Sequence, residues 1–391
     1  MSTSPRESLL ARHRQLAPSA AIRVSPICLG AMNFGDAFKD RLGECTKDSA
    51  FEILDHFFSQ GGNFIDTSNG YQAGQSEMWL GEWMATRQNR DQIVLATKYS
   101  GVSRHPPENI HLRSNFGGNG SKSMRLSIEE SLRRLQTSYI DVFYVHWWDY
   151  ATSIEELMHS LNDLVTSGKC LYLGISDTPA WVVAKANQYA RMSGLRQFSV
   201  YQGMWNAALR DFERDIIPMC RAEGMGICPY GVLNQGRFQT EEVYQERESN
   251  NPGRKYTAVS DHDKSVAKAL QDISARKDAD TKITQVALAY VMQKAPYVFP
   301  IVGGRTVEHI KGNIAGLSVV LEDKEVEEIE SAYRFDPGFP HTFLSGTLLK
   351  GHDATPRGAY NASDVWYLET MGPIDFVEPQ KAIQVKGKST A

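Results

Sequence analysis

The chain has 391 residues, of which 41% are hydrophobic and 23% are charged, and its formal net charge is −4. This composition is ordinary for a soluble globular protein and offers no basic excess for binding nucleic acid. No stretch approaches the ~20 consecutive apolar residues needed to cross a bilayer, and the first residues lack the apolar core of a signal peptide. We therefore expect a cytoplasmic protein without a nucleic-acid or membrane partner.

Eight short apolar runs, rich in β-branched and aromatic residues, are the predicted strands. They span residues 24–30, 63–68, 93–99, 139–147, 170–176, 198–204, 224–231 and 297–304. Segments with helical periodicity separate or follow them, at 48–60, 76–87, 126–136, 154–166, 178–193, 211–223, 262–294 and 306–315. Apolar strands that alternate with amphipathic helices predict a parallel sheet covered by helices.

Three of these helices carry start signals. Ser127 and Ser153 are each followed three residues later by glutamate, which is the spacing of a capping box. Thr178 followed by Pro179 predicts an N-cap with proline in the first helical turn.

Eight strand and helix units close most naturally into a (β/α)8 TIM barrel. An open doubly wound sheet is the alternative, but no GxGxxG motif follows the first strand. We expect a single domain over residues 1–391, with the barrel at about 20–335, a mobile N-terminal segment at 1–19 and a C-terminal extension at 336–391. Insertions near 101–124 and 238–262 could cover the site as loops, and the extension is expected to contribute to the substrate site.

The five cysteines are odd in number and lack CxxC spacing. Most lie in apolar runs, which is typical of reduced, buried thiols that pack as small hydrophobes. Neither a disulfide framework nor a zinc site is indicated, and no metal ligands are predicted.

Titratable side chains stand at the ends of neighbouring predicted strands. Asp66 ends the second strand, Lys98 lies near the end of the third, His146 follows the apolar run of the fourth, and Tyr71 lies just beyond Asp66. The C-terminal strand ends of a barrel form its active site. Each residue alone has a structural explanation, such as a turn-forming aspartate or a hydrogen-bonded histidine. Four compatible groups on one rim favour a catalytic site.

These four residue types suit proton transfer to a developing alkoxide. A free tyrosine has a pKa near ~10, so donation around neutral pH would need a pKa lowered by roughly three units, about 4 kcal/mol. Lys98 would stabilise the phenolate of Tyr71, Asp66 would hold Lys98 charged, and His146 would hydrogen-bond the reacting oxygen. The four residues include no hydride source, so a cofactor is required at the same rim.

The motifs "GGNFIDTSNGY", "ATKY" and "DVFYVHWWD" resemble the Asp, Tyr, Lys and His tetrad of the aldo-keto reductase superfamily. Over about residues 20–335 the chain is most similar to fungal aryl-alcohol dehydrogenases and norsolorinic acid reductase-like enzymes. The stretches "LYLGISDTPAW", "FSVYQGMWNAALRDFERDI" and "APYVFPIVGGRTVEHIKGNI" carry that closer similarity.

The resemblance implies an extended NADP(H) bound without a Rossmann fold. Ser176 and Gln202 would bind the carboxamide, Tyr230 would stack on the nicotinamide, and Arg305 would anchor a 2′-phosphate at a helix N-terminus. The complete expected cofactor set is Asp66, Ser176, Asp177, Gln202, Tyr230, Gly231, Val232, Leu233, Gly236, Arg237, Gly303, Gly304, Arg305, Thr306, His309 and Asn313. Read without the resemblance, Ser176 and the glycines could serve helix capping and turns.

The function expected from the resemblance is reversible, NADPH-dependent reduction of an aldehyde or ketone. Tyr71 would be the proton donor, and His146, Trp147 and Trp205 would contact an aryl or aromatic polyketide substrate. The alternative is a nucleotide-binding sensor or accessory subunit with little turnover. A third possibility, an isomerase or lyase without nicotinamide, would need a phosphate or metal site for which the sequence offers no clustered ligands.

Overall fold

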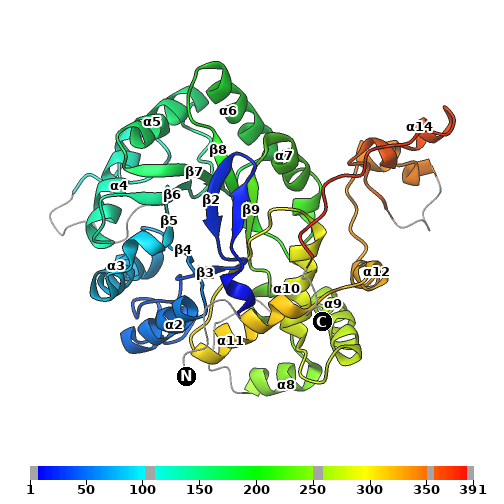
Figure 1. Ribbon diagram of the computed structural model, residues 1–391, viewed down its shortest axis with the longest axis horizontal. Coiled ribbons are helices and arrows are strands. Elements are labelled where there is room, and N and C mark those ends of the chain that lie inside the picture. The colour runs from blue at the N-terminus through cyan, green and yellow to red at the C-terminus, as the bar shows by residue number, and fades with distance from the viewer. Residues whose placement is uncertain (1–7, 102–110, 250–258, 350–355, 385–391) are drawn as a thin grey trace, which may run out of the picture.

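The computed structural model describes residues 8–101, 111–249, 259–349 and 356–384 and contains a barrel of eight parallel strands (Figure 1). The strands are β3 (Cys28–Gly30), β4 (Phe64–Asp66), β5 (Val94–Tyr99), β6 (Ile140–Val145), β7 (Cys170–Ser176), β8 (Phe198–Met204), β9 (Gly226–Tyr230) and β10 (Ile301–Val302). Ile227 in β9 bonds to Tyr297 O and Phe299 N at 2.9 and 2.8 Å, which joins β9 to the segment before β10. The predicted TIM barrel is confirmed.

Helices surround the barrel in Figure 1. Those between successive strands, or after the last, are α2 (Lys47–Ser59), α3 (Gln75–Arg87), α4 (Ser121–Arg134), α5 (Ile154–Thr166), α6 (Ala180–Met192), α7 (Ile216–Glu223), α10 (Ile283–Lys294) and α11 (Val307–Ala315). The additional ones are α1 (Lys39–Leu42), α8 (Glu241–Ser249), α9 (Asp261–Arg276), α12 (Asp323–Ser331), α13 (His341–Leu344) and α14 (Trp366–Glu369). Over the described residues, none is both long and apolar enough to cross a membrane.

Two cores lie on opposite faces of the barrel sheet. Phe64 belongs to the cluster inside the barrel, whereas its neighbour Ile65 packs in the cluster between sheet and helices. Successive side chains of a strand point to opposite faces. Because both faces are buried, both sets of side chains are apolar, and each strand is a continuous hydrophobic run. All five cysteines are buried and none is paired.

The same alternation places polar side chains at the top of the barrel interior. Each stands two residues after an interior core residue of its strand. These pairs are Phe64 and Asp66, Ala96 and Lys98, Tyr144 and His146, Val200 and Gln202, and Cys228 and Tyr230. The period of two therefore delivers these five polar groups to one interior face.

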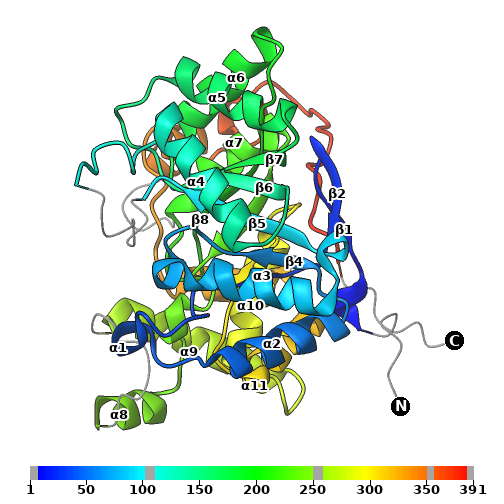
Figure 2. The same cartoon turned by 90° about the vertical axis from the view of Figure 1, so that its left-hand side faces the viewer.

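An antiparallel hairpin of β1 (Arg14–Ala17) and β2 (Ala20–Val24) closes the opposite end of the barrel. Figure 2 shows this hairpin at one end and α1 and α8 at the other. Leu16 and Ala17 are fully buried in the interior cluster. The prediction of a mobile segment over 1–19 is therefore wrong for β1, because its apolar side chains plug the barrel; residues 1–7 lie outside the described part.

Several helix starts differ from the prediction. The Ser153 cap is confirmed, since its side chain accepts from the Glu156 N–H. Ser127 instead lies buried inside α4, which begins six residues earlier. Pro179 is itself the N-cap of α6, and the Thr178 hydroxyl does not cap the helix but donates to Ser176 O at 2.7 Å.

The predicted long helix over 262–294 is two helices, α9 and α10. The predicted helix over 211–223 is likewise divided, into a 3-10 turn at Asp211–Glu213 and α7. The predicted first strand over 24–30 is shorter, because β2 ends at Val24 and β3 begins at Cys28.

The C-terminal extension contacts the outside of the barrel at a few points, while α14 projects away from the barrel in Figure 1. Arg214, just before α7, donates to Pro337 O at 2.9 Å, and Gln380 donates to the Tyr297 hydroxyl at 3.5 Å. The expected contribution of the C-terminal extension to the substrate site stays a prediction. Of the two insertions, residues 241–249 form α8 and residues 121–124 begin α4, while 102–110 and 250–258 lie outside the described residues.

Candidate active site

A buried cluster of charge lies at the upper end of the barrel interior. Parallel pairing sets Asp66 of β4 opposite Ala96 of β5, two residues before Lys98. The fully buried Lys98 Nζ donates to Asp66 Oδ1 at 2.5 Å and to the Tyr71 hydroxyl at 3.2 Å. The structure thus brings together the predicted aspartate, lysine and tyrosine.

The ammonium of Lys98 keeps its charge although it is buried. Burial by itself would lower its pKa, but the contacts with Asp66 and Tyr71 outweigh burial and raise the pKa above its ordinary value. Gln202 of β8 donates to the other Asp66 oxygen, Oδ2, at 3.1 Å. Both carboxylate oxygens are therefore hydrogen-bonded, as a buried charge requires.

Tyr71 stands on a backbone turn that is held in an uncommon conformation. The next two residues, Gln72 and Ala73, have φ values of 49° and 57°, in the left-handed region. Arg134 of α4 donates to Asn69 O at 3.0 Å on the other side of Tyr71. Such strain persists where surrounding contacts enforce it, and here it positions the phenol over Lys98.

The protonation of Tyr71 differs from the sequence-based expectation. Burial is the largest influence and raises the pKa of Tyr71, while Lys98 lowers it only in part and Asp66 raises it again. The pKa of Tyr71 therefore lies above its ordinary value, opposite in direction to the lowering that the sequence-based argument required of Lys98. Tyr71 is protonated at neutral pH, as a proton donor must be.

His146 follows β6 and faces Tyr71 across the cavity. The two rings meet edge to face, with centroids 5.8 Å apart. The His146 Nδ1 atom lies 3.3 Å from the Ser68 hydroxyl. Burial, assisted by Lys98, lowers the pKa of His146 well below its ordinary value, so the imidazole is neutral.

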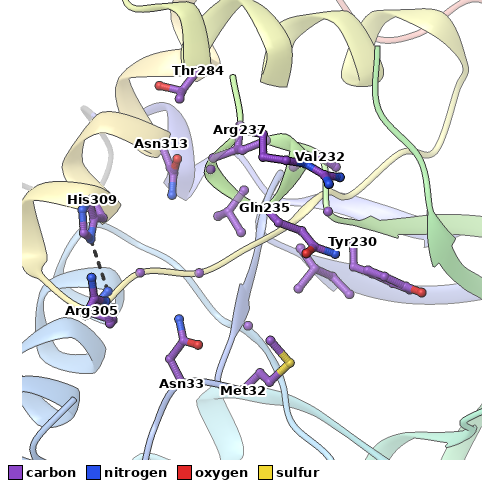
Figure 3. A pocket seen from close by; sticks show the side chains of 18 of the residues that line it. Met32, Asn33, Tyr230, Val232, Gln235, Arg237, Thr284, Arg305, His309 and Asn313 are labelled. Atoms are coloured by element: carbon purple, nitrogen blue, oxygen red, sulfur yellow. Dashed lines mark hydrogen bonds between the residues drawn. The ribbon is translucent and has the colours of Figure 1, made fainter. Parts of the chain in front are cut away.

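A cavity of ≈ 1550 Å³ opens above this cluster. It runs from Tyr71 and His146 across the β9 loop to the N-terminus of α11, and Figure 3 shows part of its lining. The predicted residues that line it are Asp66, Tyr71, His146, Asp177, Gln202, Tyr230, Gly231, Val232, Leu233, Gly236, Arg237, Gly303, Gly304, Arg305, His309 and Asn313. The volume exceeds that of a usual drug-sized site and suits a long ligand.

The far end of the cavity is a tight turn before α11. The Arg305 N–H donates to His309 Nδ1 at 3.2 Å, as drawn in Figure 3. Gly304 packs so closely that an added Cβ would lie 2.6 Å from His309 Cβ. The Arg305 guanidinium lies over Gly43 beyond α1, where an added Cβ would be 2.1 Å from Nη1. A cation and a helix N-terminus therefore meet at this end.

Polar groups at the ends of β7 and β9 face each other. The Tyr230 hydroxyl donates to Asp177 Oδ2 at 3.1 Å. The Ser176 hydroxyl is buried without a hydrogen bond of regular geometry among the described residues, although it helps to lower the pKa of Asp177. Burial is the larger influence and raises the pKa of Asp177 to about 6.

Replacing Asp177 with asparagine should remove one pH-dependent cost of folding. Since the folded carboxyl has the higher pKa, ionisation above about pH 6 opposes folding, and this cost is absent below the unfolded pKa of ~3.9. The stability of Asp177→Asn relative to wild type should therefore rise between about pH 4 and pH 6. Chemical denaturation at several pH values measures this difference; a difference that stays constant or falls would contradict the expectation.

Some predicted site residues lie away from the cavity wall. Lys98 is behind Tyr71, and Thr306 caps α11 by accepting from the His309 N–H. Trp147 is 41% exposed beside His146, with ring centroids 4.6 Å apart. Trp205 is fully buried and donates to Glu213 at 3.2 Å, so its prediction as a substrate contact is wrong.

Other lining residues were missed by the sequence reasoning. Met32 and Asn33 follow β3 and lie across the cavity from Tyr230 in Figure 3. Their place just after the first predicted strand was an available signal, because that strand end belongs to the same rim. Gln235 lies in the β9 loop between the predicted cofactor residues Leu233 and Gly236, whereas no sequence pattern marked Lys282 and Thr284 at the start of α10.

Comparison with known proteins agrees with this geometry. The model of the aldo/keto reductase family matches residues 26–334. The chain is 64% identical over 377 residues to norsolorinic acid reductase B of Dothistroma septosporum, covering 96% of this chain and 95% of that protein. It is 51% identical over 395 residues to an aryl-alcohol dehydrogenase of Pestalotiopsis microspora, covering 100% and 98%. The chain belongs to the aldo/keto reductase family of oxidoreductases.

Proposed function

We propose that this protein is an NADPH-dependent carbonyl reductase whose substrates are aryl aldehydes or aromatic polyketide ketones of secondary metabolism, with alcohol oxidation as the reverse reaction. The observation that carries the proposal is the contact of Tyr71 with the buried Lys98–Asp66 pair beside a neutral His146. Relatives named norsolorinic acid reductase and aryl-alcohol dehydrogenase support the aromatic substrate class. A cytoplasmic location is part of the proposal.

The side chains would divide the proton chemistry among them. Tyr71 would donate its proton to the carbonyl oxygen as negative charge develops there. Lys98 would stabilise the resulting phenolate from 3.2 Å, and Asp66 would keep Lys98 oriented. His146 would donate a hydrogen bond to the same oxygen from the other side.

The cavity lining fits a nicotinamide dinucleotide phosphate. Asn33 lines the cavity, and its Oδ1 is buried without a hydrogen-bond partner among the described residues, so it can serve a polar ligand; the similarly unpaired Ser176 hydroxyl lies behind the lining. Tyr230 and Gln202 would hold the nicotinamide end and Arg305 the 2′-phosphate end, and all three line the cavity. When bound, the cofactor would supply the hydride.

Trp147 supports an aromatic substrate. Its half-exposed ring lies beside His146, and an added Cβ at Gly101 would come within 3.0 Å of it. A flat aromatic face next to the proton-donating groups could stack on an aryl ring.

The test is to follow absorbance of NADPH in the presence of benzaldehydes, naphthaldehydes and hydroxylated anthraquinone ketones. Multiple turnovers with at least one aromatic carbonyl, and slower turnover with aliphatic aldehydes of the same size, are expected. Tight NADPH binding with only single-turnover oxidation across the whole panel would contradict the proposal and favour a nucleotide-binding accessory role.

Replacing Arg305 with alanine should raise the KM for NADPH by about 10- to 100-fold, since a hydrogen bond to a charged group contributes roughly 1.5–3 kcal/mol. The KM for NADH should change much less, because NADH lacks the 2′-phosphate. Steady-state kinetics with both cofactors measures this, with the exposed Arg41→Ala on α1 as the matched loss of a surface guanidinium. Equal rises in both KM values would show that Arg305 does not read the 2′-phosphate.

A further inference from the structure

Ser68 connects the loop after β4 to the ring of His146. It lies two residues after Asp66 and is fully buried. Its hydroxyl oxygen is 3.3 Å from His146 Nδ1, 3.4 Å from the Gly70 N–H that donates to it, and 3.5 Å from Asn69 Oδ1. The hydroxyl carries one proton, and within the described part of the chain its two acceptors are His146 Nδ1 and Asn69 Oδ1.

The neutral imidazole of His146 also carries one proton, on either Nδ1 or Nε2. If Ser68 donates to Nδ1, the proton must be on Nε2. If Nδ1 carries the proton, it donates to Ser68, and the Ser68 proton can only go to Asn69 Oδ1 at the longest of the three distances. The contact with His146 Nδ1, at 3.3 Å, is shorter than the contact with Asn69 Oδ1, at 3.5 Å, and this favours Ser68 as donor to Nδ1.

The proton on Nε2 matters because His146 lines the cavity. With Nδ1 engaged by Ser68, Nε2 is the ring nitrogen left for a ligand; among the described residues it has no hydrogen-bond partner. An Nε2–H group can donate to a carbonyl oxygen, whereas the other tautomer would present a lone pair to that oxygen and repel it.

We propose that Ser68 is a positioning residue that holds neutral His146 in the Nε2–H tautomer, so that the imidazole donates to the substrate oxygen together with Tyr71. The inference rests on the proposed function for its catalytic consequence, but the tautomer itself exists whether or not the protein turns over. Ser68 acts only through His146 and does not reach the reacting atoms.

The tautomer is measured directly by nuclear magnetic resonance of the full chain labelled with ¹⁵N-histidine. The chain has 10 histidines, and His146→Gln assigns the His146 signals by their loss. Wild type should show the Nε2–H tautomer alone, and Ser68→Ala should show a mixture of both. An Nδ1–H tautomer in wild type, or an unchanged pattern in Ser68→Ala, would overturn the proposal.

Two further variants separate the ring contact from general packing. Ser100→Ala removes a hydroxyl that accepts from the backbone N–H of His146 at 3.1 Å, so the tautomer should not change. Ser68→Thr keeps the hydroxyl and should keep the wild-type tautomer. If Ser100→Ala alters the tautomer as much as Ser68→Ala does, the direct contact is not the cause.

Kinetics then tests the catalytic consequence. Ser68→Ala should lower kcat about 3- to 10-fold, the range of one ordinary hydrogen bond, with the KM for NADPH unchanged and with activity restored in Ser68→Thr. A wild-type protein that shows the Nε2–H tautomer but reduces no carbonyl would refute the proposed function and leave the tautomer assignment standing. A mixed tautomer with unchanged kcat would overturn the catalytic part of the inference.

Discussion

Replacing Tyr71 with phenylalanine should lower kcat for carbonyl reduction by roughly 10²- to 10⁴-fold, the usual contribution of a general acid. The hydroxyl donates the proton and is the only atom removed, while the ring keeps its edge-to-face contact with His146. Binding of NADPH should change little, because the proposed phosphate and adenosine contacts lie at the far end of the cavity. Steady-state kinetics and fluorescence titration of NADPH measure the two quantities separately.

The matched control is Tyr99→Phe, which removes a buried phenol on β5 that donates to Asn119 O at 3.0 Å outside the cavity. It should cost about 1 kcal/mol of stability and leave kcat nearly unchanged. If Tyr71→Phe keeps most of the wild-type turnover, Tyr71 is not the proton donor. If both variants lose activity alike, loss of packing explains the effect better than loss of a donor.

Replacing Lys98 with methionine should both abolish turnover and destabilise the fold by about 3–5 kcal/mol. Methionine fills similar space, but it leaves the carboxylate of Asp66 buried without its cation. Because burial already raises the pKa of Asp66, the unpaired carboxyl should bind a proton in the folded state. An acid with a raised folded pKa loses stability as the pH rises, so the destabilisation should be smaller at about pH 5 than at about pH 8.

Denaturant unfolding of Lys98→Met, Asp66→Asn and the double variant tests this explanation. The double variant should be more stable than Lys98→Met, because it removes the unpaired charge, and its stability should depend less on pH. Equal stability of Lys98→Met and the double variant at high pH would show that the buried charge is not responsible. Activity should be absent from the single lysine variant and the double variant.

Strand and helix order followed from the sequence because each barrel strand is buried on both faces. Strands 170–176 and 198–204 and helix 154–166 have the predicted bounds. The hairpin β1 and β2 was missed because its strands are short and only Leu16, Ala17, Ala20 and Val24 are fully buried. Nothing local distinguishes such a plug from a mobile N-terminal segment.

Candidate site residues could also be chosen from the sequence, because polar residues stand out where a fully buried strand ends. Asp66, Lys98 and His146 end apolar runs on successive strands, and a two-residue repeat in a barrel must point such residues to the same interior. Trp205 was wrongly chosen because it lies three residues after the inward-facing Gln202, so the two-residue repeat turns its side chain outward to Phe212 and Glu213. The sequence showed which residues lie near strand ends and which share a face, whereas the structure showed which of the two faces is the interior.

The sequence by itself determined the alternation of strands and helices, the family resemblance and the identity of the groups at the barrel rim. Only the tertiary structure decided which charges those groups carry. Lys98 is paired with Asp66, burial raises the pKa of Tyr71 and lowers that of His146, and the Ser68 hydroxyl reaches the His146 ring from the loop after β4. The protonation of each group depends on its burial and on its distance from charged residues far away in the chain. Both are fixed only when the barrel has closed.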